Sequence, residues 1–278
     1  NLQILICGNN ELTSLNVQGL ANLQILICGN NELTSLNLQG LTNLLQLGCG
    51  LNQLISLNVQ GLTNLLSLSC NQNQLPSLNV QGLTNLQSLG CSFNQLTFLN
   101  FQGLANLQTL DCDNNNLTSL NVQGLTNLQS IRCNENLLPT LNLQGLTNLQ
   151  YLDCSFNQQL ISLNVQGLAN LQELYCLSNQ LSSLNFQGLT NLQILNCSGN
   201  QLTSLNVQGL PNLFKLACSN NQLTALFIKN TNLGSWQVLD FNNNPNLVYV
   251  CADEDDLTFV QQKVNQFGYA VTCQINSY

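Results

Sequence analysis

The chain has 278 residues, of which only 6% are charged, against roughly 25% in an average globular protein. Its net charge of -8 comes from 12 acidic and 4 basic residues. Four basic side chains cannot form the basic stripe that binding to a phosphate backbone requires, so the composition argues against nucleic acid as a partner. The absence of His removes His-dependent triads and His metal ligands. No apolar run approaches the roughly 20 residues of a membrane span.

The cysteines reveal an internal repeat. Eleven of the 13 recur every 21 residues, with one interval of 22 between Cys154 and Cys176. The unit reads N-L-Q-x-L-x-C-x-x-N-x-L-x-x-L-N-V-Q-G-L-T, and eleven copies cover residues 1–232. This period and pattern are typical of leucine-rich repeats, here with Cys in the third Leu position. We therefore predict a leucine-rich-repeat solenoid over residues 1–232, followed by a degenerate repeat and a C-terminal cap over 233–278.

The spacing of apolar residues within one unit predicts its conformation. Leu5 and Cys7 are separated by one residue, so in an extended strand both point inward, whereas positions four, six and eight point outward. Leu15 and Val17 indicate a second, shorter strand on the opposite side of the coil. Gly19 leaves no room for a helix of useful length. We expect a β-rich solenoid with a parallel sheet on one face and short strands or 3-10 turns on the other.

Two columns of residues are expected inside this solenoid. The tenth position of each unit is Asn, and a buried amide there can satisfy backbone groups in the turn after the strand. The cysteine column is interpreted as buried, reduced thiols, with disulfides between adjacent strands as the alternative. Because the repeat lacks the C-x₂₋₄-C spacing of metal sites, we predict no metal and no cofactor. The Asn16 and Gln18 columns are expected to form amide ladders along the solenoid.

The C-terminal segment has the pattern of a β-α-β cap. A strand around Val250 is followed by Asp253, which is expected to cap a helix with acidic residues in its first turn. Gly268 ends this helix, and a returning strand is predicted over residues 270–275. Such a segment would cover the last coil of the repeat array. The helix is expected to place four apolar residues on one face: Leu257, Val260, Val264 and Phe267.

The repeat resembles a known family. The segment LQYLDCSFN at residues 149–157 is similar to the cysteine-ladder repeats of internalin J, a bacterial surface adhesin, and to those of secreted flavobacterial and other Bacteroidetes proteins. The tail from Val250 to Tyr278 resembles the segment that closes the array in those flavobacterial proteins. The resemblance implies a protein that is secreted or displayed on a bacterial cell surface. In that setting we predict a disulfide between Cys251 and Cys273, which lie outside the cysteine column.

Repeats five to nine carry charged and aromatic residues at outward positions that are otherwise Ser, Gly, Thr, Asn or Ile. Arg132 is expected to lie between Asp111 and Asp153 on neighbouring strands, with Phe93 and Phe156 on the adjoining turn edge. Charged and aromatic side chains on a face of otherwise small, uncharged residues are typical of a recognition surface. The alternative is that the charges only satisfy one another and the Phe rings pack into the turns. The candidate ligand-binding residues are Asp111, Asp113, Arg132, Tyr151, Asp153, Glu173 and Tyr175.

These observations predict a non-enzymatic extracellular module for adhesion, which recognises a protein or a glycan through the outward face of the sheet. Hydrolysis by paired carboxylates and calcium binding are disfavoured, because a ladder spreads its acids along a line. The alternatives are a structural spacer and a binder of ice or crystalline polysaccharide, although regular outward Thr columns are lacking. We expect a monomer, with end-to-end contact through the first coil as a further possibility.

Overall fold

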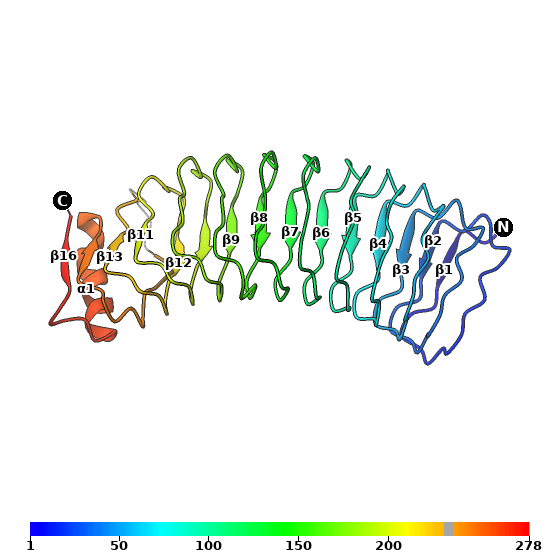
Figure 1. Ribbon diagram of the computed structural model, residues 1–278, viewed down its shortest axis with the longest axis horizontal. Helices are drawn as coiled ribbons and strands as arrows, with labels where there is room; N and C mark the ends of the chain where they lie inside the picture. The colour runs from blue at the N-terminus through cyan, green and yellow to red at the C-terminus, as the bar shows by residue number, and fades with distance from the viewer. Residues whose placement is uncertain (231–235, 278) are drawn as a thin grey trace. The chain divides into compact units, whose positions relative to one another are not determined.

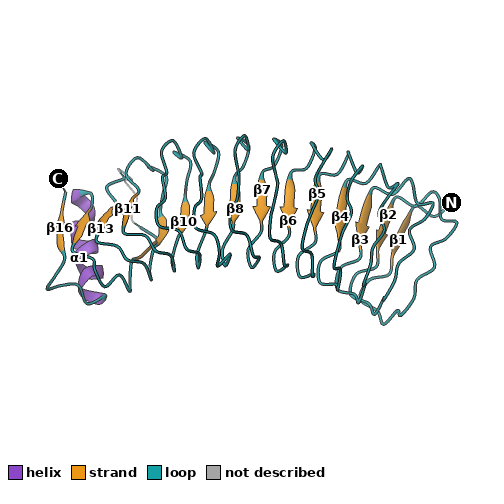
Figure 2. Ribbon diagram, viewed as in Figure 1, coloured by secondary structure: helices purple, strands orange, loops and turns teal. Residues whose placement is uncertain are grey.

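A computed structural model describes residues 1–230 and 236–277, which form turns of a β-solenoid, called coils below, and a helical cap (Figures 1 and 2). The chain divides into two compact units, Asn1–Leu138 and Pro139–Tyr278. The predicted boundary between repeats and cap, at residues 232 and 233, lies outside the described residues. The boundary therefore stays a prediction.

The first unit is built on one parallel sheet. Each three-residue strand pairs with the strand of the next coil, so that Leu5 faces Leu26 and Leu26 faces Leu47. The central residue of each strand from β2 onward is fully or almost fully buried, while its two neighbours face outward, as the alternation predicts. The strands are β1 (Ile4–Ile6), β2 (Ile25–Ile27), β3 (Gln46–Gly48), β4 (Ser67–Ser69), β5 (Ser88–Gly90), β6 (Thr109–Asp111) and β7 (Ser130–Arg132).

The second unit contains strands on both halves of its coils. One group, paired in parallel from β8 to β14, continues the strand position of the repeat: β8 (Tyr151–Asp153), β9 (Glu173–Tyr175), β10 (Ile194–Asn196), β12 (Lys215–Ala217) and β14 (Val238–Asp240). The other lies on the return half of the coil: β11 (Ser204–Asn206), β13 (Ala225–Phe227), β15 (Tyr249–Cys251) and β16 (Gln274–Asn276). The predicted second strand thus forms at β11 and β13, one residue earlier than expected, whereas most described returns of the other coils are turns.

The cysteine column lies in the core, as predicted. Its members from Cys28 to Cys218 are fully buried, Cys7 is half-buried, and none is joined in a disulfide. The alternative of disulfides between adjacent strands is therefore wrong. Some thiols donate to the next coil, as in Cys112 Sγ to the carbonyl of Arg132 at 3.3 Å. Burial is the main cause that raises the pKa of Cys28 to about 12, so these thiols stay protonated at neutral pH.

The asparagine column also behaves as predicted. Asn52 Nδ2 donates to the carbonyls of Cys28 and Cys49, each at 3.1 Å, and Asn52 Oδ1 accepts from the backbone N–H of Leu33 at 3.0 Å. The same bonds recur at Asn73, Asn94 and other ladder positions. One amide thus joins the turns of adjacent coils and satisfies buried groups that the turn leaves unpaired.

The predicted ladder at Asn16 is wrong, whereas the Gln18 column bridges coils at some positions: Gln60 Nε2 donates to the carbonyl of Asn79 at 2.9 Å, and Gln81 Nε2 donates to Gln102 Oε1 at 3.1 Å. Asn16 Oδ1 accepts from the backbone N–H of Gln18 at 3.0 Å, so the amide closes a turn within its own coil. Further bonds between coils come from the first Asn of the repeat, as where Asn43 Nδ2 donates to the carbonyl of Ala21 at 2.9 Å. Sequence reasoning missed this ladder because an exposed Asn beside a turn closes the turn as readily as it bridges coils.

The cap consists of a 3-10 turn, η1 (Glu254–Asp256), and helix α1 (Leu257–Gln266), which ends before Gly268 at φ 83°. Val260 and Val264 are buried, as the apolar stripe predicts. Asp253 does not cap the helix with its side chain. Its Oδ2 instead accepts from the backbone N–H of Asn230 at 3.0 Å, so a contact with a distant segment replaces the expected local one.

The predicted disulfide between Cys251 and Cys273 is absent, and both residues are thiols. Strand β15 pairs with β16 so that Cys251 faces Asn276, three residues beyond Cys273. At about 3.3 Å per residue, this offset separates the two Cα atoms by about 10 Å along the strand, beyond the roughly 7 Å limit for a disulfide. The register of the last strand therefore decides against the bond.

Candidate functional site

The outward face of the sheet in the first unit changes character along the chain. Its first coils present isoleucines, with Ile6 70% exposed, and glycines and serines follow. Charge enters at β6 and β7, whose register places Asp111 directly beside Arg132. Asp111 is half-buried and Arg132 is exposed, so their charged ends lie on the solvated surface of the sheet.

Asp113 has a structural role that the sequence did not reveal. Its Oδ1 accepts from the backbone N–H of Asn134 at 2.8 Å, and the side-chain amide of Asn134, with its nitrogen facing Asp113, donates to the same carboxylate. Asn71 makes the equivalent bond to the backbone N–H of Ser92 at 2.9 Å. The Asp113 carboxylate thus orders the turn of the next coil.

In the second unit, four of the candidate residues meet on two adjacent strands. The register of β8 and β9 places Tyr151 beside Glu173 and Asp153 beside Tyr175. The Tyr175 hydroxyl donates to Glu173 Oε2 at 2.9 Å. The rings of Tyr151 and Tyr175 lie diagonally across the strands, with centroids 5.6 Å apart and planes tilted by 40°. We call these four half-buried residues the tyrosine patch.

The environment of the tyrosine patch sets its protonation. Burial, then the hydrogen bond and charge of Glu173, raise the pKa of Tyr175 to about 12. The phenol therefore stays a hydrogen-bond donor across the physiological range. Asp153 Oδ1 accepts from the backbone N–H of Ser155 at 3.0 Å, which fixes the position of the carboxylate beside the rings.

The surface continues beyond the predicted residues. Ile194 and Asn196 on β10 pair with Glu173 and Tyr175, so an apolar and an amide side chain border the tyrosine patch. Their types are common on outward positions of the repeat, and only the register shows that they border the patch. Arg132 belongs to the first unit and Asp153 to the second, so their expected proximity stays a prediction.

The Phe residues of the turn edge are exposed rather than packed into the turns. Phe93 is 52% and Phe156 42% exposed. Both occupy the position before the ladder Asn, where the backbone adopts a left-handed conformation with φ 53° and 56°. The predicted alternative that these rings serve as turn packing is therefore wrong.

The residues that the structure describes contain no group of three or more Cys, Asp or Glu side chains arranged to hold a metal ion. Across the same residues, no helix has the length and apolar character needed to cross a membrane.

Comparisons with known proteins place the fold among bacterial leucine-rich-repeat proteins. The functional domain of InlJ from Listeria monocytogenes, which includes a cysteine ladder, superimposes with a TM-score of 0.66 and 26% identity over 99% of this chain and 63% of the InlJ chain. A leucine-rich-repeat protein of Leptospira interrogans superimposes with a TM-score of 0.69 and 27% sequence identity. The match covers 99% of this chain and 83% of the Leptospira chain. An internalin of Listeria monocytogenes superimposes with a TM-score of 0.77 over 100% of this chain and 87% of the internalin chain. Because the sequence identity is 21%, this similarity concerns the fold alone.

No protein-family model matches the chain, and no curated protein matches its sequence. The parallel strands, the 21-residue register and the structural likenesses together show that the chain is a leucine-rich-repeat solenoid. The buried cysteine and asparagine columns are part of that architecture.

Proposed function

We propose that the chain is a non-enzymatic binding module that recognises a protein partner through the tyrosine patch. The observation that carries this proposal is the tilted pair of half-buried Tyr rings, one of which is held by Glu173. Aromatic residues that are rigid before binding lose little conformational entropy on binding, and Tyr is enriched among the residues that dominate protein interfaces. A structural spacer or an ice-binding lattice has no need for such a cluster.

The similarity to InlJ, whose structure has the same kind of cysteine column, supports action at a bacterial surface or in the extracellular medium. We propose that Asp111 and Arg132, on the sheet of the first unit, have a smaller role, since charges on a solvated surface contribute little affinity and mainly steer association. We further propose that the chain acts as a monomer, which sedimentation velocity on the isolated protein would test.

The proposal is tested by screening the chain against arrays of host proteins and of glycans, followed by titration of any hit with variants. Tyr151→Ala and Tyr175→Ala should each weaken binding by about 2 kcal/mol, or roughly thirtyfold. The matched controls are Ser88→Ala and Thr109→Ala, two residues on the outward face of the sheet in the first unit. Both variants should leave the affinity unchanged. Two results would show that the tyrosine patch does not bind proteins. One is a protein ligand that binds both Tyr variants as tightly as the parent, and the other is a screen in which only glycans bind the chain.

A further inference from the structure

The fifth coil, residues 85–105, departs from the repeat at two positions of its return half. Phe98 stands where the neighbouring coils have Ser77 and Ser119. Phe101, three residues later, stands where those coils have valine. Phe98 is 58% exposed, although its column is otherwise mostly small and polar, whereas Phe101 is 5% exposed. An exposed ring next to a buried ring gives this coil a surface that its neighbours lack.

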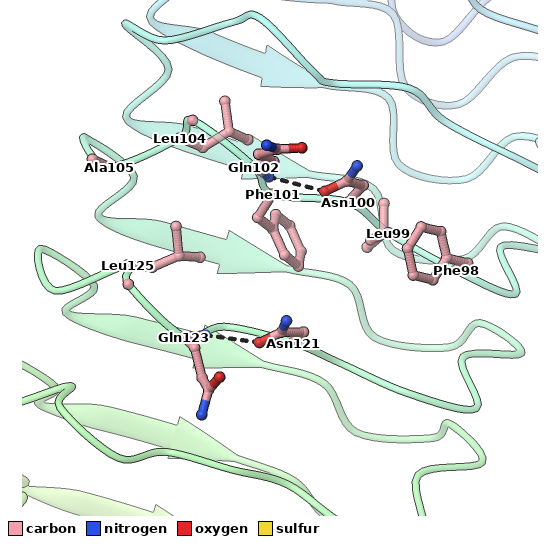
Figure 3. A pocket seen from close by; sticks show the side chains of 12 residues that line it. Phe98, Leu99, Asn100, Phe101, Gln102, Leu104, Ala105, Asn121, Gln123 and Leu125 are labelled. Atoms are coloured by element: carbon pink, nitrogen blue, oxygen red, sulfur yellow. Dashed lines mark hydrogen bonds between the residues drawn. The ribbon is translucent and has the colours of Figure 1, made fainter.

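A groove of about 500 Å³ lies between the return halves of the fifth and sixth coils. Figure 3 shows the ring of Phe101 at its centre and that of Phe98 at one end, with amide side chains from both coils beside them. No charged residue lines the groove. A groove of equal size between the second and third coils, about 490 Å³, is lined by equivalent amides but has no aromatic ring.

The amides that line the groove retain unused hydrogen-bonding groups. Asn100 Oδ1 and Asn121 Oδ1 accept from the backbone N–H groups of Gln102 and Gln123, at 3.0 and 3.1 Å. Within the described part of the chain, the nitrogens of both Asn side chains and the whole amide of Gln123 make no bond to protein. Three amide groups with free donors, one of them also with a free acceptor, therefore flank the two rings.

We propose that this groove binds a neutral oligosaccharide, at a site separate from the tyrosine patch. The apolar C–H face of a hexose ring can stack on Phe98, while its hydroxyls, each both donor and acceptor, match the amides of Asn100, Asn121 and Gln123. Since the groove has no charge, it offers nothing to a phosphate or a uronic acid. The volume suits one or two sugar units, with the rest of the chain in solvent.

The test is calorimetric titration of the intact chain with cellohexaose, laminarihexaose and maltohexaose, each to 5 mM. At least one hexaose should bind, and Phe98→Ser, which restores the residue of the neighbouring coils, should weaken its binding about tenfold or more. Gln123→Ala should also weaken it. Gln60→Ala, at the equivalent position of the groove without aromatic rings, is the matched control and should bind as the parent does.

Circular dichroism and thermal unfolding of each variant verify that the fold is intact. Failure of all three hexaoses to bind, or equal binding by Phe98→Ser and the parent, would overturn the proposal. Tyr151→Ala should leave saccharide binding unchanged, so the groove and the tyrosine patch can fail independently. A saccharide lost with Tyr151→Ala and kept with Phe98→Ser would place binding on the sheet and refute this site.

Discussion

Replacement of one internal ladder asparagine tests the main structural inference. In Asn52→Ala, the carbonyls of Cys28 and Cys49 each lose a donor at 3.1 Å, and the backbone N–H of Leu33 loses its acceptor at 3.0 Å. The site is buried, with Asn52 9% exposed, so water does not readily replace these bonds. A buried group left unsatisfied costs about 1–3 kcal/mol, and we expect a loss of about 2 kcal/mol in the free energy of unfolding.

Asn10→Ala is the matched control. Asn10 donates to the carbonyls of Cys7 and Gly8 at 3.1 and 3.0 Å, but it is exposed, so water can take over both bonds. We expect this variant to lose at most about 0.5 kcal/mol. Urea unfolding, monitored by circular dichroism, measures the free energy of unfolding of each variant and of the parent, compared at equal m-value. Equal losses in the two variants would refute the reasoning that burial makes the ladder stabilising.

Three further predictions concern the backbone and the thiols. Leu51 has φ 55° at a position where several other coils have Asn, so Leu51→Asn should raise the free energy of unfolding by about 0.5–1 kcal/mol, and an unchanged urea midpoint would contradict this. Burial raises the pKa of Cys28 to about 12, well above the ordinary value of a cysteine thiol, so protonated thiols favour the folded state. Their contribution is complete below about pH 8 and declines as pH rises toward 12, so urea midpoints should fall over this range. In native protein at pH 8, thiol reagents should label Cys7 and Cys273 before the buried column, and early labelling of the column would contradict the assigned register.

The candidate site was only partly predictable. The repeat placed Tyr151, Asp153, Glu173 and Tyr175 on one face, and the register of β8 and β9 confirms that they are neighbours. The hydrogen bond from Tyr175 to Glu173 and the tilt of the rings depend on side-chain rotamers, which the sequence does not encode legibly. Asp113 was predicted as a ligand-binding residue, yet its carboxylate holds the turn of the next coil.

The amino-acid sequence by itself determined the coil, its inward leucines and thiols, and the face on which each outward residue lies. A strict 21-residue period with alternation inside the strand allows only one register, because a slip of one residue would expose the apolar column. Only the tertiary structure decided the absence of the Cys251–Cys273 bond, the partner of Asp253 and the groove beside Phe98. These depend on how the irregular last strand pairs and on where individual side chains come to rest, and both are set by distances between segments that the repeat pattern does not specify.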